Sequence, residues 1–228
     1  MGSRSQVLRA ILLAALAAAC TEDPPNSADQ RSPPAGSQGT ATVERGGRLA
    51  LALGFIRDDG ERPTFVPLEH STILRSGTQL RLALRYDGTC HAYVFHSDNH
   101  GALDVLHRPP SSAGASGDQT YVVLPEGSVL DGRAGIEAIH VIASEHPLVT
   151  LERLIAESDA AAEDAKPAAR SALWEEITRL RATHEHLDRR AEIPGTIGGH
   201  VRGDALELTW TAYRFSDAIS LTFTIDHR

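Results

Sequence analysis

Apolar and polar side chains alternate without interruption between Thr78 and Tyr86. The apolar positions are Leu80, Leu82, Leu84 and Tyr86, and the positions between them are Gln79, Arg81, Ala83 and Arg85. Successive side chains of a β-strand point to opposite faces, so this period of two predicts a strand with one face in a core and the other towards water.

A hairpin is predicted between Cys90 and Pro110. Two apolar runs, 93–95 and 103–106, flank the sequence Ser97-Asp98-Asn99-His100-Gly101. Short polar residues that tolerate a left-handed backbone, followed by glycine, are typical of a tight turn between antiparallel strands. The polar groups of this turn are expected to face solvent on a rigid two-stranded base.

Further short β-rich runs occupy 48–56, 119–124 and 136–144, and the Pro, Ser and Gly residues of 109–118 indicate a loop. The run 136–144 is largely apolar on both faces, which favours a central strand. Short strands separated by turn residues are typical of all-β domains. The fold class we predict is therefore mainly β, an antiparallel β-sandwich over residues 42–147.

The periodicity changes after residue 147. Apolar residues recur at helical spacing in a segment predicted over 148–192, with Leu173, Ile177, Leu180 and Leu187 on one stripe. Two strands then follow within 193–228, and the simplest interpretation is a closing β-hairpin packed on the same domain. A separate small unit of helices and strands is the alternative.

The chain begins with features of an export signal. Two arginines precede an apolar run from Ala10 to Ala19, which is shorter than the roughly 20 residues that a membrane span needs. The ending Leu16-Ala17-Ala18-Ala19-Cys20 resembles the lipobox of bacterial lipoproteins, although Ala17 stands where leucine is usual. We predict a signal peptide over 1–19 and lipid attachment at Cys20, with an ordinary secretory signal as the alternative.

Residues 20–41 are predicted to form a flexible tether, because they contain no large apolar side chain that could be buried. Thr21 follows the cysteine in place of the aspartate that resembles an inner-membrane retention signal. The expected location is therefore the bacterial cell envelope, with a lipid anchor in the outer membrane and the domain facing the periplasm or the surface.

Composition narrows the classes of partner. The formal net charge is -8 and the basic residues form no stripe, which excludes a nucleic-acid backbone as the expected partner. Hydrophobic residues make up 41% of the chain, enough for a core. The two cysteines, Cys20 and Cys90, give no disulfide framework. No cofactor is expected, since neither a phosphate-binding glycine loop nor a dinucleotide fingerprint occurs.

Several segments together resemble a known family. These are Tyr93-Val94-Phe95-His96-Ser97-Asp98 with Gly101, then Tyr121-Val122-Val123-Leu124-Pro125, then Gly135-Ile136-Glu137 with Val141-Ile142-Ala143-Ser144. In this order they resemble the domain of unknown function 4384 (DUF4384) over roughly residues 60–157. His107-Arg108-Pro109 stands where that family commonly has Phe-Pro-Asn. The resemblance implies an accessory module of the bacterial envelope and no known reaction.

Four of the eleven histidines lie in or beside the hairpin, at positions 91, 96, 100 and 107. His96, Asp98 and His100 are the candidate ligand contacts, because an imidazole and a carboxylate that approach across a turn are a legitimate set of metal ligands. The competing interpretation is that they are exposed strand and turn residues. No metal site is predicted outright.

Four other features of the sequence have a structural interpretation that competes with a functional one. Thr183-His184-Glu185-His186-Leu187-Asp188 has Asp188 where a zinc-binding His-Glu-x-x-His helix needs histidine. Gly114-Ala115-Ser116-Gly117-Asp118 lacks the last glycine of a nucleophile elbow. Cys90 is expected to be a small buried hydrophobic residue. Trp174 and Trp210 are expected to pack helix against sheet, with a ligand groove as the alternative.

The sequence therefore favours a non-catalytic, lipid-anchored envelope protein that acts as a binding or structural accessory module. Its partner, an envelope protein or a ligand, is not specified by any motif. The alternative is a metal-dependent hydrolase that uses histidines of the 91–107 hairpin.

Overall fold

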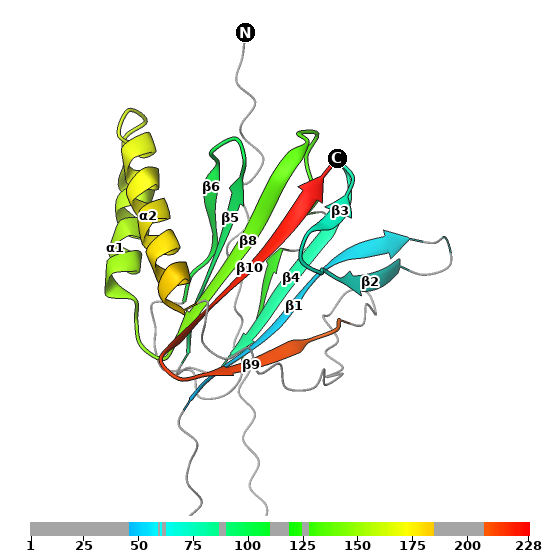
Figure 1. Cartoon of the computed structure of the whole chain (residues 1–228), viewed down its shortest axis with the longest axis horizontal. Helices are drawn as coiled ribbons and strands as arrows, with labels where there is room; N and C mark the ends of the chain where they lie inside the picture. The colour runs from blue at the N-terminus through cyan, green and yellow to red at the C-terminus, as the bar shows by residue number, and fades with distance from the viewer. Residues whose placement is uncertain are drawn as a thin grey trace, which may run out of the picture. The chain divides into compact units, whose positions relative to one another are not determined.

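The strands form two sheets that face each other, with two helices on one side (Figure 1). The computed structural model describes residues 46–58, 60, 63–86, 90–109, 119–124, 128–184 and 208–228. In the first sheet the order is β2 (Pro63–Pro67), β1 (Gly47–Asp58), β4 (Leu80–Tyr86) and β7 (Gln119–Leu124), and β9 (Thr211–Phe215) also pairs with β1. In the second it is β3 (Thr72–Leu74), β10 (Ala218–His227), β8 (Gly135–Ser144), β5 (His91–Asp98) and β6 (Leu103–His107).

The predicted fold class is confirmed: the protein is mainly β and sandwich-like, with a helical segment before the last two strands. Among the strand pairs of the described residues, β3 and β10 are parallel and the others are antiparallel. The predicted hairpin is β5 and β6, and the predicted run 119–124 is β7.

The space between the sheets is filled by the alternating apolar side chains. Leu82 and Leu84 of β4 face Val94 of β5 and Val141 of β8, and each of these side chains is at most 1% exposed. Burying one such side chain contributes about 1.5–3 kcal/mol relative to leaving it in water. The period of two in β4 is thus explained by its position in the sandwich.

Strand β8 is central, as its two apolar faces predict. It lies between β10 and β5, with Ile139, Val141 and Ala143 in the core between the sheets. Ile142, on the opposite face, belongs to a second core beneath the helices. The strand therefore packs against apolar side chains on both sides.

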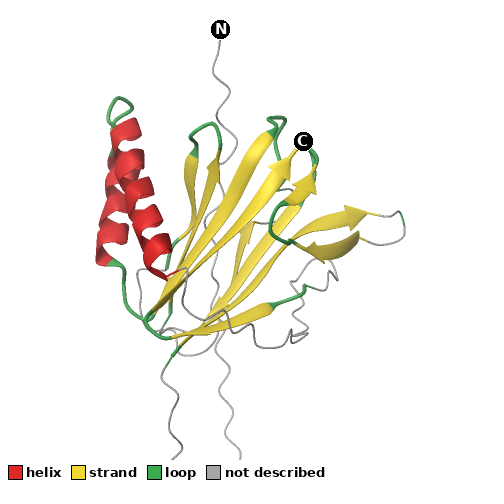
Figure 2. Cartoon of the chain, viewed as in Figure 1, coloured by secondary structure: helices red, strands yellow, loops and turns green. Residues whose placement is uncertain are grey.

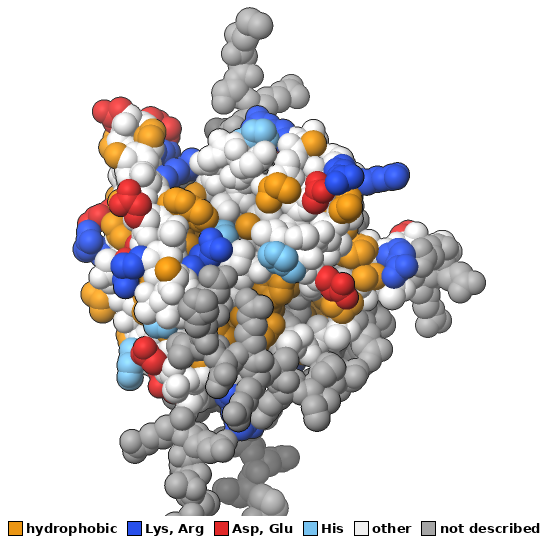
Figure 3. All heavy atoms as spheres, viewed as in Figure 1, with side chains coloured by type: hydrophobic (Ala, Val, Ile, Leu, Met, Phe, Trp, Pro, Cys, Tyr) orange, Lys and Arg blue, Asp and Glu red, His pale blue; other side chains and the backbone are white. Residues whose placement is uncertain are grey.

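The helices α1 (Val149–Ala160) and α2 (Lys166–His184) cover the outer face of the second sheet (Figure 2). Their buried stripe consists of Leu151, Ile155, Leu173, Ile177 and Leu180, and it packs against Tyr93, Phe95 and Ile142. Charges of both signs lie over the exposed side of the helices (Figure 3), including the Arg153–Glu157 ion pair. Within the described residues, no helix is long and apolar enough to cross a membrane.

Tyr93 joins β5 to the start of α1. Its hydroxyl donates to Glu152 Oε1 at 2.7 Å and accepts from the backbone N–H of Leu148 at 3.3 Å. The second contact satisfies a backbone donor next to the first turn of the helix, where intrahelical partners are missing. The position of the helical layer is therefore fixed by partly buried polar contacts as well as by apolar packing.

The last two strands separate into different sheets at the turn Ser216–Asp217. β9 pairs with β1, whereas β10 pairs with β8 and β3. Asp217 has φ 75°, a left-handed conformation that suits a tight corner. This refines the predicted closing hairpin: the two strands are consecutive and belong to the same sandwich, but their partners are strands from opposite sheets.

Trp210, just before β9, packs on the outer face of the first sheet. It is 2% exposed, clusters with Phe65 and Leu208, and lies under the Arg85 guanidinium, 4.7 Å from the ring centroid. The expectation that both tryptophans pack helix against sheet therefore holds only for Trp174 of α2, whose ring meets His140 edge-on at 5.3 Å.

Two isoleucines of β8 provide a test of this packing. Ile142 is fully buried and Ile136 is 50% exposed. We expect Ile142→Ala to lower the free energy of unfolding by about 2–5 kcal/mol, because it leaves a cavity beneath the helices. Ile136→Ala, the matched control, should cost less than about 1 kcal/mol. Urea unfolding followed by tryptophan fluorescence measures both, and equal losses would contradict the described burial.

Candidate functional site

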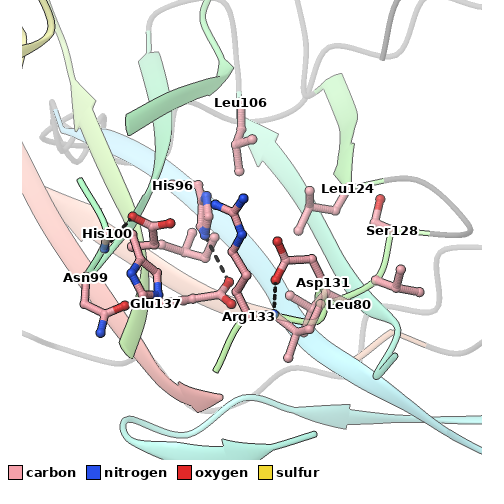
Figure 4. Close-up of a pocket in the computed structure, with 14 residues that line it drawn as sticks. Leu80, His96, Asn99, His100, Leu106, Leu124, Ser128, Asp131, Arg133 and Glu137 are labelled. Carbon is pink, nitrogen blue, oxygen red and sulfur yellow. Dashed lines mark hydrogen bonds and ion pairs between the residues drawn. The ribbon is translucent and has the colours of Figure 1, made fainter. Parts of the chain in front are cut away.

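A cavity opens at the end of the sandwich where the β5–β6 hairpin and the start of β8 meet residues 128–133. Its volume is about 220 Å³, the liquid volume of about seven water molecules. The polar lining side chains are His96, Asp98, Asn99, His100, Ser128, Asp131, Arg133 and Glu137, and the apolar ones are Leu80, Leu106, Leu124, Val129, Leu130 and Ile139 (Figure 4). The cavity thus has a partly apolar wall and carries charges of both signs.

Glu137 links histidines from the two strands that flank β8. Its Oε2 lies 3.0 Å from Nε2 of His96 on β5, and its Oε1 lies 2.7 Å from Nδ1 of His227 on β10. The other ring nitrogen of His227, Nε2, contacts the hydroxyl of Ser76 at 2.9 Å. Both carboxylate oxygens and both nitrogens of His227 therefore have polar partners.

The sheet register places these three side chains together. Glu137 pairs with Asp98 across β5 and with Ile225 across β10. His96 and His227 are two residues away from those partners, so they lie diagonally on the same face as Glu137, within the reach of long side chains. That face is the one that Ile139 and Val141 occupy farther along β8. The inner face of β8 thus changes from apolar to ionic at Glu137.

His96 is charged at neutral pH. Burial lowers the pKa of His96, but contacts with Asp104 and Glu137 raise it more, and the result is a pKa of about 9. The Asp104 contact is a 3.8 Å ion pair with a carboxylate that is 57% exposed. The Glu137 contact is shorter and its carboxylate is only 13% exposed. Although burial opposes it, the two histidines hold the pKa of Glu137 below its usual value.

Asp131 approaches this network from the segment before β8. The backbone of 128–130 bonds to 77–80, through Leu80 N to Ser128 O at 2.8 Å and Leu130 N to Thr78 O at 3.0 Å. This pairing anchors the chain just before Asp131, whose Oδ1 accepts from the N–H of Arg133 at 2.7 Å. Among the described residues, Asp131, Glu137 and His227 form one group whose ligand atoms lie within 4.8 Å of one another.

The predicted turn is built as the sequence indicates. Asp98 Oδ1 accepts from the backbone N–H groups of His100 at 2.9 Å and Ala102 at 2.7 Å. Gly101 has φ 87°, a conformation that glycine adopts without steric cost. A Cβ at Gly135 would lie 2.2 Å from Asn99 Oδ1, so a larger residue there would displace the Asn99 side chain.

The three predicted ligand contacts, His96, Asp98 and His100, all line the cavity. They do not form the metal-competent group found among the described residues, because Asp98 caps its own turn and His96 pairs with Glu137. His100 contacts the carbonyl of Ala134 at 3.4 Å. The other two histidines of the hairpin lie elsewhere: His91 is about 17 Å along β5 from His96, and His107 contacts the hydroxyl of Tyr86 at 2.8 Å.

Sequence reasoning missed the roles of Glu137, His227, Asp131 and Arg133. Glu137 had one signal, the Gly-x-Glu step within the DUF4384 resemblance. His227 had none, because its position beside Ser76 depends on contacts between segments 151 residues apart.

A second polar cluster lies beneath α2. His140 is 2% exposed, and its ring contacts Ser97 Oγ at 2.9 Å and Thr222 Oγ1 at 3.2 Å. Burial lowers the pKa of His140 to about 4, so the ring is neutral. A serine beside an imidazole resembles half of a catalytic triad, but such a weak base, whose other ring nitrogen contacts Thr222 rather than a carboxylate, suits a structural link between sheet and helix.

The side chain of Cys90 is buried in the core between the sheets, as expected. Cys20, the signal peptide, the tether and the Gly114–Asp118 motif lie outside the described residues. Of the Thr183–Asp188 motif, only Thr183 and His184 are described, and they end α2.

Comparisons of the chain with protein-family models, with curated proteins and with solved structures returned no match. The resemblance to DUF4384 stays a prediction.

The raised pKa of His96 predicts the direction in which stability changes with pH. The unfolded pKa is about 6.5, so the His96 ion pairs stabilise fully below pH 6.5 and the stabilisation is lost as pH rises through about 9. In metal-free buffer, the free-energy difference between wild type and His96→Gln should shrink by about 1–3 kcal/mol between pH 6 and pH 10. Urea unfolding at several pH values measures it.

Glu137 and Asp104, the two carboxylates that contact His96, can be compared by matched amide substitutions. We expect Glu137→Gln to lower the NMR titration midpoint of His96 more than Asp104→Asn does, because the Glu137 pair is shorter and less exposed. The assignment of Glu137 as the main partner would be wrong if Asp104→Asn had the larger effect.

Proposed function

We propose that this protein is a non-catalytic, lipid-anchored module of the bacterial cell envelope that binds a small polar ligand in the cavity beside Glu137. The anchor rests on the sequence features around Cys20. The binding role rests on one structural observation: a rigid sandwich end holds a cavity of about 220 Å³ with converging charged groups. Cavities with a mainly apolar wall and a few placed polar groups are typical ligand sites.

The chemistry of the cavity favours a ligand with both donors and acceptors. Arg133 and charged His96 can bind an anionic group, whereas Asp131 and Glu137 can bind a cationic group or a metal. The volume is below the roughly 300 Å³ at which sites for drug-sized molecules begin. The ligand is therefore an ion or a molecule of a few heavy atoms.

The alternative, a metal-dependent hydrolase that uses the hairpin histidines, has less support from the geometry. His91, His96, His100 and His107 have separate environments, and burial lowers the pKa of His107 to about 4 beside Tyr86. A hydrolytic site needs a converging ligand set with an open coordination position. The histidines of the hairpin do not supply that set by themselves.

The anchor predicts the behaviour of a cysteine variant. Cys20→Ala removes the thiol that would carry the lipid, so the protein should move from the membrane fraction to the soluble fraction. Cys90→Ala, which changes the only other cysteine, should remain with the membrane. Fractionation of cells that express each full-length variant, followed by immunoblotting, measures the distribution. Membrane retention of Cys20→Ala would refute the lipid anchor.

The binding role predicts that filling the cavity abolishes binding. Val129 lines the cavity and is 53% exposed, so Val129→Trp can block the opening with little cost to the core. Ile136→Trp, at a residue of similar exposure outside the lining, is the control. Saturation-transfer NMR with a mixture of amino acids, small carboxylic acids and phosphate esters should give signals for wild type and Ile136→Trp.

Those signals should disappear for Val129→Trp. No signal from any compound with the wild type, or equal signals from the two tryptophan variants, would contradict binding in this cavity. Conversion of a compound during the experiment would contradict the non-catalytic assignment.

A further inference from the structure

Three groups from separate segments meet at one side of the cavity: Asp131 and Glu137 line it, and His227 contacts Glu137. His227 ends β10, Glu137 begins β8, and Asp131 precedes β8 by a short connection. Their ligand atoms, one imidazole nitrogen and two carboxylate oxygens, lie within 4.8 Å of one another. Figure 4 shows the carboxylates of Asp131 and Glu137 directed into the same space.

We propose that Asp131, Glu137 and His227 bind one divalent transition-metal ion of the zinc class. Zinc is held by imidazole nitrogen and carboxylate oxygen at about 2.0–2.2 Å, and three protein ligands leave a fourth position for water or another ligand. The imidazole favours zinc over magnesium or calcium, which prefer oxygen ligands alone. The fourth position would face the cavity.

The surroundings of His227 match those of a metal-binding histidine. Its ring is fully buried, and Ser76 holds Nε2 at 2.9 Å, which directs Nδ1 to Glu137. Histidines that bind metals usually bond their second nitrogen to a polar neighbour that fixes the ring. A hydroxyl can donate or accept, so Ser76 keeps its contact when the proton moves from Nδ1 to Nε2.

Glu137 is likewise held in place by a polar neighbour. His96 Nε2 contacts Oε2 at 3.0 Å, which leaves Oε1 beside Nδ1 of His227. A metal ion would replace the hydrogen bond between Oε1 and Nδ1, and Asp131 would close the site from the solvent side. Two atoms that bind one zinc ion in a tetrahedral site lie about 3.3 Å apart, so a separation of up to 4.8 Å requires only a small movement of the exposed Asp131.

The metal site deepens the proposed function, because it names the chemistry of one ligand. Only the biological use of the metal rests on the proposed function; the binding of the metal does not. Titration calorimetry with Zn²⁺ on the purified, chelator-treated full-length chain should show one site that Asp131→Asn weakens more than about tenfold, since even outer-shell partners of a metal contribute about 10- to 100-fold. Asparagine keeps the oxygen that accepts from Arg133 N–H, so the fold of this segment is preserved. His227→Gln and Glu137→Gln should weaken binding as well.

Asp226→Asn is the matched control. Asp226 precedes His227 on the same strand and pairs with Arg228, so its removal changes the charge equally without touching the group. Co²⁺ in place of Zn²⁺ should give visible absorption bands that Asp131→Asn removes and Asp226→Asn retains. No stoichiometric Zn²⁺ binding, or equal affinities for wild type and Asp131→Asn, would overturn the metal site.

Binding of Ca²⁺ alone, unaffected by His227→Gln, would also overturn it. The small-molecule NMR experiment on chelator-treated protein separates the two proposals. Small-molecule binding without Zn²⁺ binding leaves the proposed function intact and rejects the metal. The reverse result would be that Val129→Trp still binds Zn²⁺ while no small molecule binds the wild type. That result would support the metal site and reject the binding of small molecules in the cavity.

Discussion

The fold depends on one strand that is buried on both faces. β8 must pack against the opposite sheet through Ile139 and Val141 and against the helices through Ile142. Such a strand has no solvent face, so its polar side chains must lie at its ends or have hydrogen-bond partners. At its first residues the inter-sheet core ends, and there Glu137 has two histidine partners. The candidate site is thus located where the core stops.

His96, which is partly buried, and His140, which is buried, differ in charge because their partners differ. His96 faces carboxylates and stays charged. His140 contacts hydroxyls of Ser97 and Thr222, and burial keeps it neutral with a pKa of about 4. The contribution of His140 to folding stability therefore changes with pH in the opposite direction to that of His96. The neutral His140 ring is compatible with folding above pH 6.5, and stability is lost as pH falls from 6.5 towards 4. One residue type therefore serves in this sheet both as an ion-pair partner and as a neutral structural link.

Local periodicity was sufficient to predict β4, β7, the β5–β6 turn and the central position of β8, because each depends on neighbours in sequence. It could not give strand partners. β9 and β10 look like a simple hairpin in sequence, but their register with β1 and β8 is decided by side chains more than 70 residues away. The site was predicted only where the turn forms it, at His96, Asp98 and His100. His227 and Asp131 enter it through long-range pairing that no spacing encodes.

The charges around Glu137 are a poor means of stabilising a sandwich. Buried ion pairs lose much of their attraction to desolvation, and apolar replacements of similar volume are often as stable or more stable. This chain has ample apolar core farther along the same strands. Exposure also changes across the site in an ordered way: the His227 side chain is fully buried, that of Glu137 is 13% exposed, and Asp131 lies in contact with solvent. A network that served packing alone has no need of an open end beside a cavity, whereas a binding site needs a rigid inner end and an accessible outer one. This arrangement is the strongest reason to look for the function of the protein at Glu137.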